Sequence, residues 1–212
     1  MALTFYYGSG SPFAWKVWLT LEHKRIPYEL KALSFDKGDT RSPAFLAVNP
    51  RGKVPTIVDD GLVLWESAAI VEYLEERYPE PCLLPRDVKA RALARRIAAE
   101  SESFLTPAVN ELFRVTLFRE GPEDADALAK AQARLMDELP RFEAQLSGDF
   151  FVGELSLADF TVYPQVRNIK RIEQRAPGKG LGDRIPARLE AWMKRIEALP
   201  YYAKTTPPHW KA

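Results

Sequence analysis

The sequence has only one cysteine, Cys82, and only two histidines, His23 and His209, among its 212 residues. A single cysteine cannot form an internal disulfide, which fits a reducing compartment, and we expect the protein in the cytoplasm. The histidines lie far apart in sequence and no zinc-ligand pattern accompanies them, so no metal site is expected. The chain also has no Gly-x-x-x-x-Gly-Lys-Ser/Thr segment, which excludes a phosphate-binding loop of that kind.

An excess of one charge and a long apolar run are missing as well. The chain has 30 basic and 29 acidic residues, so its net charge is +1. A balanced surface attracts neither nucleic acid nor an anionic membrane, and we expect neither as a partner. No apolar run approaches the length of about 20 residues that spans a bilayer, and the first residues lack the pattern of a secretory signal. Hydrophobic residues make up 46% of the chain, enough for the core of one large or two small domains.

The first 80 residues alternate between strand patterns and helical patterns. Apolar residues predict strands over 3–7 and 27–33, with a helix between them. Residues 56–65 predict a hairpin, because two apolar runs flank an Asp-Asp-Gly turn. A helical pattern then begins at Ser67 and ends before Pro79. This order predicts a small mixed four-stranded sheet that is covered by helices.

After a proline-rich linker, the pattern becomes helical. Residues 87–119 predict one long helix with a kink at Pro107, and further helical patterns follow without a convincing strand. We therefore expect an α/β domain over residues 1–80, a linker over 81–86 and an all-helical domain over 87–212.

One pair in the helical half has a structural role. Ser156 and Asp159 have the spacing of a capping box, in which each side chain meets the other residue's backbone N–H. Replacing Asp159 with alanine is expected to lower the stability by about 1 kcal/mol or more.

Three segments carry a resemblance to a known family: GSGSPFAWKV, NPRGKVPTIVDDGLVLWESAAIVEYLEERYP and GELSLADFTVYP. With the order of the elements, they make the sequence resemble the cytosolic glutathione S-transferases over nearly its whole length. The resemblance is closest to the classes that use a serine near the N-terminus, such as the theta and zeta classes and many bacterial members. It implies a thioredoxin-like first domain that binds glutathione, a helical domain that contributes an electrophile pocket, and a homodimer.

Ser11 and Pro12 predict the start of a helix, because serine is a favoured N-cap residue and proline a favoured first helical residue. The resemblance adds that the Ser11 hydroxyl and the helix dipole stabilise the glutathione thiolate. Lowering a thiol pKa from about 8.5 to the mid-sixes takes roughly 2.7 kcal/mol, which a charge-assisted hydrogen bond and the dipole can supply. Ser9 lies in the same turn and remains the alternative, whereas Tyr6 and Tyr7 fit strand packing.

The resemblance also implies the residues that bind glutathione. The Val54-Pro55 bond is expected to be cis, which turns the backbone of Val54 toward the cysteinyl unit of the tripeptide. Ser67 opens a helix whose first N–H groups suit a carboxylate, and Glu66 suits the ammonium of the γ-glutamyl unit. For the glycine carboxylate the candidates are Thr40, Arg41, Lys53 and, in addition, Arg51.

The second substrate is expected between the domains, against walls formed by Phe13, Phe104, Leu105, Phe113 and Trp210. Apolar walls suit a hydrophobic electrophile, so we expect a transferase that conjugates glutathione to such a compound. Two alternatives stay open: a glutathione-dependent isomerase, dehalogenase or peroxidase on the same fold, and a catalytically silent interaction module. Phe13 stands where some relatives have a reactive cysteine, which argues against a mixed-disulfide mechanism and against the zeta isomerase pattern.

Overall fold

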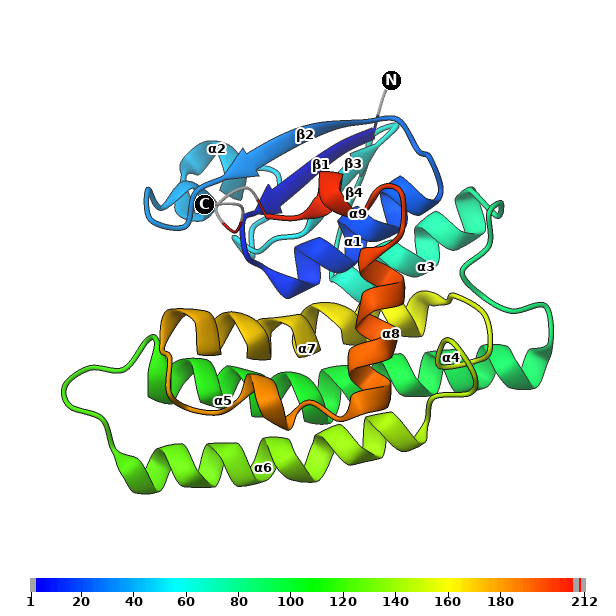
Figure 1. The fold of residues 1–212 in the computed structure, drawn as a ribbon. Coiled ribbons are helices and arrows are strands. Elements are labelled where there is room, and N and C mark those ends of the chain that lie inside the picture. Colours follow the sequence, from blue (N-terminus) through cyan, green and yellow to red (C-terminus); the bar gives the residue numbers. More distant parts are fainter. Residues whose placement is uncertain (1–2, 208–209, 211–212) are drawn as a thin grey trace. The chain divides into compact units, whose positions relative to one another are not determined.

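The computed structural model describes residues 3–207 and 210 (Figure 1). The chain divides into two compact units, one made of Met1–Leu83 with Leu199–Ala212 and the other of Leu84–Ala198. Leu199–Ala212 therefore group with the first unit, whereas the sequence analysis placed them in the all-helical domain over residues 87–212.

The first unit is built on a four-stranded mixed sheet in the order β2-β1-β3-β4. Strand β1 (Leu3–Gly8) is parallel to β2 (Tyr28–Leu33), because a helix connects them, and antiparallel to β3 (Thr56–Asp59). Strands β3 and β4 (Leu62–Trp65) form the expected hairpin. The mixed sheet that the sequence predicted is thus confirmed.

The helices of this unit are α1 (Pro12–His23), α2 (Pro43–Leu46), α3 (Ser67–Arg77) and α9 (Tyr202–Thr205), with a short 3₁₀ turn at Asp39–Arg41. Helix α1 is the inner one: it packs on α3, and every residue from 14 to 21 is buried. Its Trp18 joins an aromatic cluster with Phe5 and Tyr7, at ring-centroid distances of 6.5 and 4.7 Å. This packing fixes α1 against the sheet.

The second unit is helical. Its elements are α4 (Val88–Glu100), a π-helical turn η2 (Ser101–Leu105), α5 (Thr106–Thr116), α6 (Ala125–Ala144), α7 (Leu157–Arg175), the 3₁₀ turn η3 (Gly182–Arg184) and α8 (Ala187–Glu197). Within the described residues of this unit, the only β-type pairs are isolated bridges. None of the helices described in either unit is long and apolar enough to cross a membrane.

The predicted long helix is present, but it changes its geometry at η2. The sequence placed a kink at Pro107, whereas the structure has a π-helical turn that ends at Leu105. A proline lacks the N–H for the carbonyl four residues before it, and its ring crowds that carbonyl. Widening the preceding turn accommodates the ring, so the chain stays helical through this point.

The predicted capping box begins α7. The carboxylate of Asp159 accepts hydrogen bonds from the N–H and the Oγ of Ser156, both at 2.8 Å. It also accepts from the backbone N–H of Phe151 at 3.2 Å and from the indole N–H of Trp192 at 2.8 Å. Asp159 and Trp192 have no exposed surface, so this carboxylate joins α7 and α8 inside the core.

Candidate functional site

Ser11 is the N-cap of α1. Its Oγ accepts the backbone N–H of Ala14 at 3.3 Å, while Pro12 occupies the first helical position. In the part of the chain that the structure describes, no acceptor takes the hydroxyl hydrogen of Ser11. A half-buried serine in this state caps the helix with its oxygen and has its hydroxyl hydrogen available to donate.

Ser9 lies in the same turn but has a different environment. Its Oγ accepts a hydrogen bond from the hydroxyl of Tyr7 at 3.4 Å. Tyr7 is buried in β1, as the strand pattern suggested, and burial raises the pKa of its hydroxyl. A protonated Tyr7 therefore donates to the serine turn and helps to hold it.

The Val54-Pro55 peptide bond is cis, as expected. The preceding carbonyl, that of Lys53, accepts from the amide of Asn49 and from the hydroxyl of Thr56, each at 2.9 Å. No hydrogen bond from residues 3–207 or 210 reaches the backbone of Val54. The loop is thus held rigidly on one side of Val54 and leaves the backbone of Val54 open to a ligand.

Gly8 brings the two motifs together. A Cβ atom at Gly8 would lie 2.9 Å from Cγ2 of Val54 and 2.4 Å from Cζ of Phe35. The strand that leads into the serine turn therefore lies directly against the cis-proline loop. Phe35, whose side chain is 52% exposed, covers the same point and presents an apolar surface beside it.

A second glycine brings the candidate cations together. A Cβ at Gly52 would lie 2.7 Å from the backbone oxygen of Thr40, and Gly52 has a φ of +59°. Only glycine allows this approach, which places Thr40 and Arg41 next to the loop of Lys53. Among the described residues, no carboxylate is paired with Arg41, Arg51 or Lys53, and all three are exposed. The cluster is open to an anion.

Glu66 and Ser67 form the junction of β4 and α3. Glu66 is exposed and has a φ of 68°, which is uncommon for a residue other than glycine and costs on the order of 1–3 kcal/mol. Ser67 is the first residue of α3, and no side chain caps this helix. The uncapped N–H groups make the start of α3 suitable for a carboxylate, with the Glu66 side chain beside it.

The residues proposed for the electrophile pocket lie in different environments. In the second unit, Leu105 is fully buried in η2, whereas Phe104 is 53% exposed. The ring of Phe113 stacks on Phe118 at 5.7 Å. In the first unit, Phe13 is half-buried in the first turn of α1, and Trp210 packs edge-on against Trp15 at 5.0 Å.

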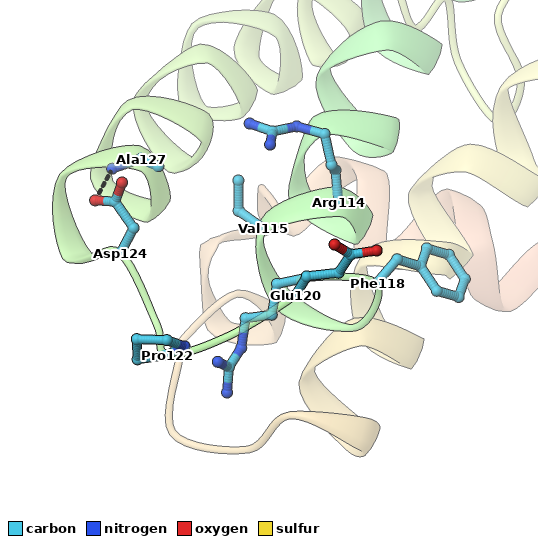
Figure 2. Close-up of a pocket in the computed structure, with 8 residues that line it drawn as sticks. Arg114, Val115, Phe118, Glu120, Pro122, Asp124 and Ala127 are labelled. Atoms are coloured by element: carbon cyan, nitrogen blue, oxygen red, sulfur yellow. Dashed lines mark hydrogen bonds between the residues drawn. The ribbon is translucent and has the colours of Figure 1, made fainter.

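The second unit has a hollow of about 470 Å³ between the end of α5 and the start of α6. Figure 2 shows Arg114 above it, Phe118 at its edge and Asp124 at the start of α6. Asp124 caps α6 through the N–H of Ala127 at 3.0 Å, and Arg114 is paired with Glu111 at 2.6 Å. These groups already serve the fold, and the hollow contains none of the residues proposed for glutathione.

Over the described residues, no group of three or more His, Cys, Asp or Glu side chains could hold a metal ion.

Sequence reasoning missed Asn49 and Phe35. Asn49 is fully buried, and its amide also reaches the Thr56 hydroxyl at 2.9 Å while its oxygen accepts from Arg51 N–H at 3.0 Å. The Asn-Pro-Arg-Gly stretch signals a turn, which would have suggested such a role for Asn49. For Phe35, the only signal in the sequence is that it is an aromatic residue within an otherwise polar segment.

A mixed sheet with a cis-proline loop beside a helix mouth makes the first unit a thioredoxin-like domain. Family models described as glutathione S-transferase, N-terminal domain, and glutathione S-transferase, C-terminal domain, match residues 10–77 and 98–200. Together they cover more than half of the chain, which therefore belongs to the glutathione S-transferase family.

Individual relatives agree with this assignment. Glutathione S-transferase 1 of Dianthus caryophyllus is 34% identical over 168 residues, which cover 77% of this chain and 76% of that protein. A maleylacetoacetate isomerase of Pseudomonas aeruginosa is 35% identical over 178 residues, covering 81% and 82%. The crystal structure of a glutathione S-transferase from the Antarctic clam Laternula elliptica matches with a TM-score of 0.88 and 34% identity, covering 100% of this chain and 94% of that one.

Proposed function

We propose that the protein is a glutathione transferase that stabilises the glutathione thiolate with Ser11 and conjugates it to a hydrophobic electrophile. The observation that carries this proposal is the contact of Gly8 with Val54. It places an open backbone segment, suited to a peptide, next to the turn that presents Ser11. A ligand that pairs with Val54 can reach the mouth of α1 with its side chain.

Each part of glutathione has a matching group in this proposal. The N–H and C=O of Val54, next to Pro55, pair with the backbone of the cysteinyl unit. The γ-glutamyl carboxylate binds at Ser67 and the start of α3, and its ammonium binds Glu66. The glycine carboxylate binds among the cations and the hydroxyl near Gly52, namely Lys53, Arg41, Thr40 and Arg51.

Ser11 acts on the sulfur through its free hydrogen. Because its Oγ already accepts from Ala14, the hydroxyl can donate to a thiolate without leaving the helix cap. A hydrogen bond to a charged group contributes about 1.5–3 kcal/mol, and the helix dipole adds to it. Since 1.36 kcal/mol corresponds to one pKa unit, the bound thiol is expected to lose its proton one to two units below its ordinary pKa. Ser9 remains the alternative donor.

A second candidate function is a glutathione-dependent isomerase. It is favoured by the relatives named maleylacetoacetate isomerase, at 34–36% identity over most of this chain. Such an enzyme would add the same thiolate to its substrate and expel it again, so the glutathione site is common to both functions. Phe13, in place of a cysteine, speaks for conjugation. By family we further propose that the protein is a homodimer and that it is cytoplasmic. Light scattering on the purified protein tests the homodimer.

The test combines glutathione titration with three variants. Calorimetry should detect binding of glutathione at millimolar concentration or below. With 1-chloro-2,4-dinitrobenzene as the electrophile, Ser11→Ala should lower kcat/KM at neutral pH by about 10- to 100-fold, matching the loss of about 1.5–3 kcal/mol. Ser11→Thr keeps both the cap and the hydroxyl hydrogen and should retain most activity. Ser9→Ala separates the two candidate donors, because it should keep most activity if Ser11 is the donor and lose it if Ser9 is.

Two results would overturn the proposal. One is no heat of glutathione binding at millimolar concentration. The other is unchanged turnover when both Ser9 and Ser11 are replaced by alanine. Faster turnover of maleylacetoacetate than of the chlorinated probe, with the same loss in Ser11→Ala, would instead identify the isomerase.

A further inference from the structure

Residues that follow the second unit in sequence pack on α1. Residues 199–207 with Trp210, which we name the strap, belong to the first unit, and α9 packs directly on α1. Figure 1 shows α9 in red beside the blue α1. The strap is far from α1 in sequence, so it adds contacts that the first 83 residues do not supply.

The strap holds the last turn of α1 by polar contacts. The hydroxyl of Tyr201 hydrogen-bonds Nδ1 of His23 at 2.8 Å. Nζ of Lys204 is 2.6 Å from a carboxylate oxygen of Glu22. These contacts fix the end of α1 that lies away from Ser11.

At the other end, the strap reaches Trp15, which is buried near the start of α1. The indole N–H of Trp15 donates to Oγ1 of Thr205 at 3.1 Å, and the Thr205 hydroxyl donates in turn to the carbonyl of Tyr202 at 2.9 Å. Thr205 is fully buried. Its single hydrogen is used on Tyr202, so its lone pair is directed to Trp15. Trp210 adds an edge-on contact to the Trp15 ring at 5.0 Å.

Trp15 is coupled directly to Ser11. Its backbone N–H donates to the carbonyl of Ser11 at 3.0 Å, which closes the first turn of α1. Trp15, which contacts the strap, and Ser11 are thus one helical turn apart, about 5.4 Å along the helix axis. A shift of Trp15 moves Ser11 with it.

We propose that Thr205 and Trp15 are positioning residues for Ser11. This inference rests on the proposed function. The strap fixes the first turn of α1 so that the Ser11 hydroxyl meets the sulfur at hydrogen-bond distance. Hydrogen bonds weaken steeply with distance and angle, and a misplacement of about 1 Å at a reacting group can cost on the order of 100-fold in rate. The alignment is stabilised by the hydrogen bond between the buried side chains of Trp15 and Thr205.

The test compares two adjacent threonines. Thr205→Val keeps the shape of the side chain and removes the acceptor for Trp15. Thr206→Val is the matched control, because the Thr206 hydroxyl also meets the Tyr202 carbonyl, at 3.3 Å, but not Trp15. Thr205→Ser restores the acceptor and serves as the rescue. Trp15→Phe removes the indole N–H together with its five-membered ring, and it reports on the same hydrogen bond from the side of Trp15.

We expect Thr205→Val to move the pH midpoint of kcat/KM upward by about 0.5 to 1 unit, which corresponds to a roughly three- to tenfold loss of kcat/KM at pH values well below the midpoint and to a smaller loss at neutral pH. The KM for glutathione should stay within about twofold, because the binding groups near Val54 are untouched. Hydrogen exchange at the backbone N–H of Ala14, which Ser11 caps, should become several times faster. Thr205→Ser should return the pH midpoint and the exchange rate to the parent values, and Thr206→Val should match the parent in all three readouts.

The outcomes separate this inference from the proposed function. The positioning role is overturned if the parent protein binds glutathione and is active, but Thr205→Val and Trp15→Phe have the same pH midpoint and the same exchange rate at Ala14 as the parent. If Thr205→Val does not fold, Trp15→Phe decides by the same readouts. A parent that takes up no glutathione refutes the proposed function and the catalytic part of this inference together, while exchange at Ala14 still shows whether the strap holds the first turn.

Discussion

Replacing Asp159 with alanine should destabilise the second unit by more than a capping residue normally does. The carboxylate accepts from two backbone N–H groups, those of Phe151 and Ser156, and from the indole of Trp192, besides the Ser156 hydroxyl. Asp159, Ser156 and Trp192 have no exposed surface, so water cannot replace the lost acceptor there. The Ser156 hydroxyl can turn to another acceptor, whereas the three N–H groups cannot.

Each buried N–H that loses its partner costs about 1–3 kcal/mol. At the lower end, the three groups set the loss at about 3 kcal/mol, compared with about 1 kcal/mol for an ordinary N-cap. For a chain of this size, 1 kcal/mol corresponds to roughly 2–4 °C in Tm, so Asp159→Ala should melt about 9 °C below the parent. Urea unfolding followed by circular dichroism gives the free energy of unfolding independently.

Asp137→Ala is the matched control, since Asp137 is exposed on α6. Its Tm should agree with the parent within about 1 °C. If Asp159→Ala also melts within 2 °C of the parent, the four hydrogen bonds do not stabilise the unit as argued.

The same carboxyl gives a pH dependence of stability. Burial raises the pKa of Asp159 to about 6 from its ordinary value of 3.8, so the folded state binds this proton more tightly than the unfolded state. The stabilisation by protonation is complete below the unfolded pKa and is lost as the pH rises through about 6. At pH 4.5 the parent should have gained about 2 kcal/mol relative to Asp159→Asn, compared with their difference at pH 7.5. A difference that stays constant between these pH values would contradict the raised pKa.

Two other substitutions test the contacts of the first unit. Gly8→Ala should weaken glutathione binding about tenfold in calorimetry, because the new Cβ would lie 2.9 Å from Val54 and 2.4 Å from Phe35. Adding Phe35→Ala should recover part of the affinity, and an unchanged Kd in Gly8→Ala would refute the contact. Lys24→Met should lower the free energy of unfolding by about 3–5 kcal/mol, because Lys24 and Glu75 form a buried ion pair at 2.6 Å. Lys24→Met with Glu75→Gln should be more stable than Lys24→Met alone; equal or lower stability would show that the pair is not the cause.

The features that the sequence predicted well are those with a local signal. The hairpin over 56–65 follows from alternating apolar residues around an Asp-Gly turn, and the start of α1 follows from the Ser-Pro pair. The capping box of α7 is likewise contained within four residues. In each of these cases, one short segment supplies both the signal and the partners.

The features that the sequence did not predict depend on segments that meet only in the fold. The approach of Gly8 to Val54 joins residues from different strands and loops. The φ of 68° at Glu66 is set by the junction of β4 with α3, since glutamate has no preference for that region. Asn49 was overlooked because its role depends on the carbonyl of Lys53, which no composition or periodicity reveals. The sequence thus predicted some residues of the candidate site, but not the contacts that bring them together.

The grouping of Leu199–Ala212 with the first unit has a consequence for how the chain folds as it is made. Ribosomes add about 5–20 residues per second, and domains generally fold in order of their appearance. Here the contacts of Trp15, Glu22 and His23 with Thr205, Lys204 and Tyr201 cannot form until residues 201–205 emerge. The second unit is complete before the first, so the nascent first unit waits without these contacts on α1 until residues 201–205 have been made.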